Sequence, residues 1–207
     1  MDKLLERFLQ YVRIDTESVP DVEQYPSSEK QKNLLRLLAD QLAEMGVDVQ
    51  MDDNYGYVYA KLPANCDGGY KLGFISHVDT SSAVSGKDVK PQITENYNGE
   101  AIALAEGRTL DPTEFPSLLA HLGKTIVSSD GTTLLGADDK AGVAVIMQAV
   151  EYLVTHPEVK HGALRIAFTP DEEVGRGTDF FDVARFDADG AYTVDGVTNL
   201  SDRARYD

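Results

Sequence analysis

Residues 71–79 read KLGFISHVD, a short apolar run that ends in polar side chains. This profile is typical of a buried strand that presents functional groups at its carboxyl end. The stretch at 163–169 has the same character, and 191–194 is a third apolar segment. A strongly apolar helix is predicted over 141–154, between the first two strands. Strands that alternate with helices predict an α/β fold, a three-layer sandwich with a mostly parallel sheet.

The amino-terminal part of the chain predicts further helices and strands around this unit. Residues 3–13 place their large apolar side chains on one helical face. Ser27 and Ser28 are expected to cap a second helix, which Gly46 ends. Residues 80–131 are polar and broken by Gly and Pro, which indicates a functional excursion or an added hairpin. Two more strands are predicted at 47–51 and 57–62.

The amino-acid composition limits the classes of molecule that the chain can be expected to bind. The 207 residues include 19 basic and 35 acidic side chains, a net charge of −16. So acidic a chain is a poor candidate for binding nucleic acid or an anionic membrane surface, whereas it suits metal cations. The single cysteine, Cys66, excludes an internal disulfide. With no secretory signal and no long apolar run in the sequence, a cytoplasmic protein is expected.

His77 and Asp79 follow the first apolar strand. Residues two apart on a strand point to the same face, so Val78 should point into the core. An Asp beside a His can orient the imidazole and strengthen it as a metal ligand. The competing interpretation is a strand end with a surface His and an Asp that begins a turn.

Three further acidic clusters accompany predicted elements. Asp138 and Asp139 open the long helix; one can cap it, which leaves the other free to bind or bridge cations. Glu172 and Glu173 follow the strand at 163–169, where one could bind metal and the other act as a general base. Asp195 follows the third strand and could be a ligand or a turn residue.

Taken together, these clusters predict one metal site. Ligands of parallel sheets bind beyond the carboxyl ends of the strands, so all four clusters should gather at one edge. One histidine with several carboxylates suits Zn²⁺, whereas carboxylates alone would favour Mg²⁺ or Ca²⁺. Motifs for a serine nucleophile, a His-Glu-x-x-His helix and a phosphate loop are absent from the sequence.

The same segments resemble a known family. Residues 73–81 (GFISHVDTS), 134–142 (LLGADDKAG), 167–175 (AFTPDEEVG) and 192–196 (YTVDG) are similar in order and text to the peptidase T family, within the dizinc exopeptidase superfamily. The resemblance covers residues 1–196. It implies the phosphorylase/hydrolase-like catalytic domain of zinc peptidases and a cytoplasmic aminopeptidase that releases the N-terminal residue of tripeptides.

The resemblance also assigns roles that the residues alone leave open. It makes Glu172 the general base and Asp79 the residue that orients His77. It implies two zinc ions, with metal ligands as follows: His77 and Asp195 on one ion, Asp138 bridging both, and Glu173 on the second.

The end of the chain departs from the family. Residues 197–207 look unrelated to it, and the family's dimerisation domain and its C-terminal catalytic segment, which carries a last histidine ligand, are missing. Homodimerisation is therefore implied only for a complete family member, and weak or absent turnover is expected of this chain. The alternatives are a non-catalytic metal-binding product and a sister dipeptidase or deacylase.

Overall fold

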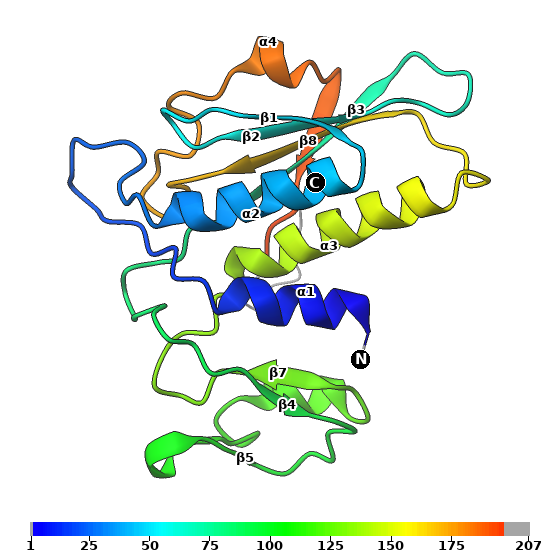
Figure 1. The fold of residues 1–207 in the computed structure, drawn as a ribbon. Helices are drawn as coiled ribbons and strands as arrows, with labels where there is room; N and C mark the ends of the chain where they lie inside the picture. The colour runs from blue at the N-terminus through cyan, green and yellow to red at the C-terminus, as the bar shows by residue number, and fades with distance from the viewer. Residues whose placement is uncertain (1, 197–207) are drawn as a thin grey trace.

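The computed structural model describes residues 2–196, so the predicted tail at 197–207 lies outside the described residues. Its centre is a five-stranded sheet in the order β1-β2-β8-β3-β9 (Figure 1). The strands of this sheet are β1 (Asp48–Met51), β2 (Val58–Leu62), β3 (Lys71–His77), β8 (Ala163–Thr169) and β9 (Gly190–Thr193). All five lie where the apolar pattern of the sequence predicted strands.

The sheet is parallel where it carries the predicted site. β3 pairs in parallel with β8 on one side and with β9 on the other, whereas β1–β2 and β2–β8 are antiparallel. The α/β class is confirmed, in a mixed sheet whose parallel half holds the three site strands. The register pairs Lys71 with Ala163 and His77 with Thr169, so β3 and β8 end level with each other.

Three helices, α1 (Lys3–Val12), α2 (Gln31–Glu44) and α3 (Ala137–Thr155), lie on one side of the sheet (Figure 1). Their apolar faces form the main core with the sheet, because helix and strand bury one face each against the other. Leu34, Leu35, Leu38 and Leu42 of α2 are fully buried there. The opposite face is covered more thinly, by the one-turn helix α4 (Val183–Phe186) and an aromatic cluster around Tyr57 and Phe186.

The predicted serine cap of α2 is wrong. The helix begins at Gln31, its N-cap position is Lys30, and no side chain caps it. Ser27 is buried instead, and its hydroxyl donates to the carboxylate of Asp171 at 2.5 Å. The Ser27 hydroxyl therefore bonds to Asp171, far along the chain, and not to the helix end, as the local sequence would suggest.

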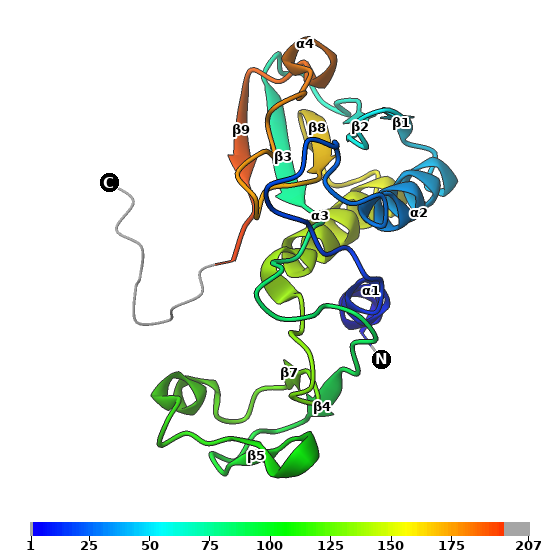
Figure 2. The same cartoon turned by 90° about the vertical axis from the view of Figure 1, so that its left-hand side faces the viewer.

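The excursion at 80–131 forms a small β lobe beside α1 (Figures 1 and 2). It contains two two-stranded sheets and two short 3₁₀ segments, and it realises the added-hairpin prediction. Its neck is closed by the Leu134 N–H, which donates to the Ser85 carbonyl at 3.1 Å. The lobe elements are β4 (Gln92–Thr94), β5 (Ile102–Ala103), η1 (Ala105–Gly107), β6 (Thr109–Leu110), η2 (Pro116–His121) and β7 (Ile126–Ser128).

No helix in the described part of the chain is long and apolar enough to cross a bilayer.

Candidate metal centre

The four predicted polar clusters meet at the carboxyl ends of β3, β8 and β9. His77 is the last residue of β3, Glu172 and Glu173 follow β8, and Asp195 follows β9. Figure 2 shows β3 and β9 side by side with their carboxyl ends pointing the same way, beside the start of α3. Asp138 lies in that first turn of α3, where its backbone is not yet helical. The register of the strands and the position of α3 thus bring together side chains that are more than a hundred residues apart in the sequence.

His77 forms the middle of this group. Its ring is almost completely buried, while Val78 points into the apolar core, as the alternation along the strand predicted. Its Nε2 atom lies 3.1 Å from Asp138 Oδ1 and 4.0 Å from Asp195 Oδ1. Ligand atoms of a tetrahedral zinc ion lie about 3.3 Å apart. The observed separations therefore fit a cation held between these three side chains.

The Asp79 carboxylate contacts both His77 and the loop that carries Glu172 and Glu173. The carboxylate is fully buried, and its Oδ1 lies 3.2 Å from His77 Nδ1. The backbone N–H groups of Glu172 and Glu173 each donate to it at 3.0 Å. With Nδ1 engaged in this way, Nε2 is the nitrogen left to face a metal. Asp79 lies where the sequence predicted an orienting residue, and its hold on the glutamate backbone is an addition.

Two sets of ligand atoms each lie within 4.8 Å of one another. One set is His77, Asp138 and Glu173, and the other is His77, Asp139 and Asp195. The four residues predicted as ligands are thus adjacent, and each set contains N and O donors suited to zinc. Among the described residues, His121, His156 and His161 belong to no such set.

Asp139 is the member that the residue assignments missed. It is buried, its side chain accepts the Ser76 hydroxyl, and it belongs to the second ligand set. Burial raises the pKa of this carboxyl to about 7, against the lowering effect of Ser76. Two adjacent aspartates indicated that one of them was free for a role other than capping the helix. Only the three-dimensional structure shows that both face the centre.

The pKa values of His77 and the surrounding carboxyl groups depend on one another. Burial alone lowers the pKa of His77, but hydrogen bonds to Asp138 and Asp79 outweigh burial and raise the pKa to about 11. The same contact with His77 holds the pKa of Asp138 below its usual range. Burial raises the pKa of Glu173 and of Asp195. Crowded carboxylates around one imidazole form an anionic pocket that favours a cation.

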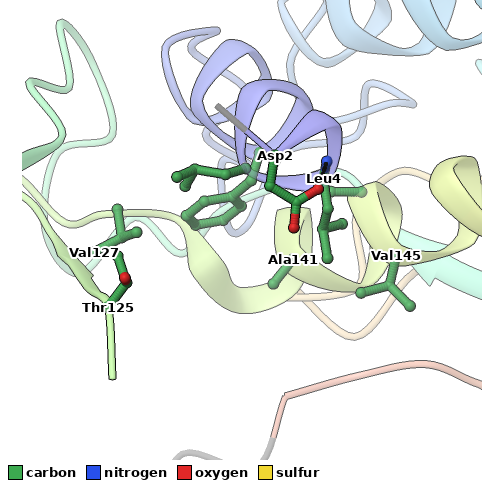
Figure 3. Close-up of a pocket in the computed structure, with 9 residues that line it drawn as sticks. Asp2, Leu4, Thr125, Val127, Ala141 and Val145 are labelled. Carbon is green, nitrogen blue, oxygen red and sulfur yellow. Dashed lines mark hydrogen bonds between the residues drawn. The ribbon is translucent and has the colours of Figure 1, made fainter. Parts of the chain in front are cut away.

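An apolar cavity beside the helices is a separate feature. It has a volume of about 370 Å³ and lies between α1, the start of α3 and the lobe strand β7 (Figure 3). Its wall is mostly apolar, with Asp2 as the one ionisable side chain, and Asp2 already caps α1 by accepting the Leu4 N–H. This cavity has no ligand set and is unsuited to a metal.

Comparison with known proteins finds similar sequences and folds among peptidases. No protein-family model matches it. It is 53% identical over 197 residues to a peptidase T of Clostridium perfringens, and 54% identical over 200 residues to a peptidase T of Desulfitobacterium hafniense. In both cases the match covers 95% of this chain and 48% of the relative. The chain therefore spans about half the length of the curated relatives it matches.

Solved structures agree in fold. The crystal structure of aminopeptidase PepT from Bacillus cereus has a TM-score of 0.66 and 28% identity, and the match covers 94% of this chain and 43% of that one. A tripeptidase from Staphylococcus aureus gives a TM-score of 0.67 at 24% identity, covering 95% of this chain and 44% of that one. Both matches thus take in nearly all of this chain and less than half of the other protein.

Proposed function

We propose that this chain, which corresponds in sequence to the amino-terminal half of peptidase T, forms the metal-binding part of a zinc aminopeptidase that releases the N-terminal residue of tripeptides. The observation that carries the proposal is the gathering of His77 and the carboxylates around it at one edge of the sheet. The sequence identity of more than half to proteins of that name supports the same reaction class.

The proposed metal ligands are those that the resemblance to the peptidase T family implies, and all four belong to the two groups of adjacent ligand atoms. His77 and Asp195 would hold one zinc ion, Asp138 would be shared, and Glu173 would serve a second ion. Neutral imidazole nitrogen and carboxylate oxygen are both good zinc ligands. When bound, zinc supplies Lewis-acid chemistry that polarises a carbonyl and acidifies water.

Glu172 is the proposed general base. Its side chain is half exposed and its Oε2 lies 3.8 Å from His77 Nε2, so it borders the centre and still reaches solvent. From there the carboxylate would accept a proton from the attacking water and return it to the leaving amine. Asp79 would hold His77 in the orientation that the centre requires, and would keep the Glu172 backbone in place at the same time.

The proposed substrates are short peptides, and the proposed setting is the cytoplasm. Nucleic acid and membranes are not expected partners, because the net charge of −16 repels both phosphate backbones and anionic lipid. Homodimerisation is proposed for a complete family member. Turnover by this chain itself is expected to be weak, because in the described residues the proposed second ion has only Asp138 and Glu173.

The test combines metal analysis with turnover on the same purified sample. Zinc per chain is measured by elemental analysis, and hydrolysis of a tripeptide is followed by release of its first residue. Zinc bound by the wild-type chain and lost in His77→Ala supports the centre, and His121→Ala in the lobe is the matched control that keeps its zinc. A chain that binds no zinc after metal loading contradicts the proposed centre.

A second candidate is a non-catalytic metal-binding product. It is favoured by the small number of protein ligands, Asp138 and Glu173, that the described residues offer to the proposed second ion. Zinc binding without any turnover would favour this candidate, and vigorous tripeptide hydrolysis would contradict it. A sister dipeptidase or deacylase is distinguished by offering N-acylated amino acids beside free-amine tripeptides.

A further inference from the structure

Asp171 stands directly before the two glutamates of the centre and has no proposed part in it. It is fully buried, although a carboxylate is rarely so unless it is paired or well hydrogen-bonded. Its backbone has a φ of 58°, in the left-handed region that non-glycine residues rarely adopt unless their surroundings hold them there. The chain thus changes direction at Asp171, at the point where it leaves β8 and begins to present Glu172.

The groups that hold Asp171 come from Ser27, shortly before α2, and from Gln31, the first residue of α2. The carboxylate accepts the Ser27 N–H at 2.6 Å, the Ser27 hydroxyl at 2.5 Å and the Gln31 Nε2 amide at 2.6 Å. In the other direction, the Asp171 N–H donates to Gln31 Oε1 at 3.0 Å. Gln31 is itself fully buried, so its amide is fixed. Both the side chain and the backbone of Asp171 are therefore tied to the segment that leads into α2.

The glutamates themselves are tied on the other side. Their two N–H groups donate to the carboxylate of Asp79, which also engages His77. The loop after β8 is thus fixed at two successive points, by Asp171 to α2 and by Asp79 to β3. Glu173 reaches the ligand set with His77 and Asp138 from a backbone that both anchors define.

We propose that Asp171 is a positioning residue for the metal centre: its hydrogen bonds to Ser27 and Gln31 set the backbone from which Glu173 faces the metal. The inference rests on the proposed metal centre. A merely architectural role, in which Asp171 only joins α2 to β8, makes a different prediction, because it would change stability without acting through Glu173.

The test measures the dissociation constant of Zn²⁺ by competition with a chromogenic chelator. Asp171→Asn keeps the shape of the side chain and removes its charge, and we expect it to weaken zinc binding by roughly ten- to a hundredfold, the range typical of residues that orient ligands. Ser27→Ala removes part of the same contact and should weaken binding less. Tyr11→Phe, which removes a hydrogen bond between α1 and Gln41 of α2, is the control and should leave zinc affinity unchanged.

A double-mutant comparison separates positioning from architecture. In a Glu173→Ala background the positioned ligand is gone, so Asp171→Asn should weaken zinc binding no further. An equal loss in both backgrounds overturns the inference, as does an unchanged dissociation constant in folded Asp171→Asn and Ser27→Ala. If the wild-type chain binds no Zn²⁺, the proposed centre fails and the inference falls with it, a result distinct from the others because it appears without any substitution.

Discussion

At the scale of single residues, the Asp79 carboxylate holds two segments of the centre together. One buried carboxylate accepts two backbone N–H groups and lies against His77 Nδ1. It therefore joins the end of β3 to the loop after β8. Because each donor loses its partner if Asp79 changes, this residue affects folding as well as metal binding.

Asp79→Asn is expected to lower the free energy of unfolding of the metal-free chain by about 3 kcal/mol, because the amide leaves buried donors without an anionic acceptor. Urea denaturation followed by circular dichroism measures the change. Asp67→Asn, in an exposed turn, is the matched control and should stay within about 0.5 kcal/mol of wild type. An unchanged midpoint for Asp79→Asn would contradict the role assigned to this carboxylate.

Zinc affinity should rise with pH because of His77. Its pKa is raised from 6.5 to about 11 in the metal-free fold, so its proton stabilises that fold below pH 6.5 and this contribution is lost as pH rises through 11. Zinc must displace this proton at neutral pH. We therefore expect the dissociation constant to fall by about tenfold for each unit between pH 6.5 and 8.5.

Chelator competition at three pH values measures this slope, and calorimetry in buffers of different ionisation enthalpy counts the protons released. His77→Ala should show a shallower slope together with weaker binding. A dissociation constant that stays the same across this pH range would show that His77 does not exchange its proton for the metal.

Sequence reasoning could name candidate site residues more easily than the contacts between them. His77, the Glu172–Glu173 pair and Asp195 could be named as candidates because each comes at the end of an apolar strand, and the end of a strand has a predictable place. Which glutamate is the base was left open by local pattern and came from resemblance alone. The hold of Asp79 on the glutamate backbone, and that of Asp171 on Ser27, depend on contacts across 90 or more residues, which no local pattern contains.

At the scale of elements, α3 packs unusually closely against the segment after β9. Gly142 makes this possible, because an added Cβ there would overlap the Val194 carbonyl and the Asp139 carboxylate. The close approach brings Asp195 beside the first turn of α3. The distance between helix and strand thus sets part of the geometry of the centre.

Gly142→Ala is expected to destabilise the chain by about 1–3 kcal/mol through overpacking, and to weaken zinc binding as well. Thermal denaturation and chelator competition on the same samples measure the two effects. Gly69→Ala, where an added Cβ meets nothing within 4 Å, is the control and should change neither. Wild-type affinity in folded Gly142→Ala would show that this packing does not affect the ligands.

Element positions were predictable where apolar periodicity is strong, as in α3 and β8, whose predicted strand has the same bounds. The start of α2 was not, because Ser27 bonds to Asp171 rather than to the helix. Nor does periodicity show that β2 runs antiparallel to β8. Pairing direction depends on the connections between strands, and local sequence leaves these undetermined.

At the scale of the whole molecule, one flank of the sheet presents apolar surface. A cavity of about 330 Å³, lined almost only by aliphatic and aromatic side chains of β3, β8 and α3, lies there. Val145 and Tyr192 nearby are 48% and 67% exposed. Within the described residues the outer edge of β9 pairs with no strand, so backbone groups are exposed beside apolar ones.

The chain is therefore expected to self-associate as its concentration rises, and sedimentation velocity measures this. The double substitution Val145→Lys and Tyr192→Lys should suppress association, because charge at the contact must be desolvated. Val183→Lys, at a residue 72% exposed on α4, is the control and should associate as wild type does. Equal sedimentation of all three proteins at every concentration would exclude this flank as the contact.

The α/β class follows from the alternation of apolar strands and helices, and the structure has it. The β lobe could be foreseen only as an interruption, since the short strands β5 and β6 have two residues each and too little pattern to recognise.

The position of the β lobe has a consequence for how the sequence of this protein can evolve. The lobe departs just after Asp79 and returns just before Asp138, and its neck is already closed by the bond between Leu134 and Ser85. The free-energy cost of closing a loop grows only slowly with its length. Insertions and deletions in the lobe can therefore accumulate while the metal centre keeps its geometry, and the two parts of the gene are free to diverge at different rates.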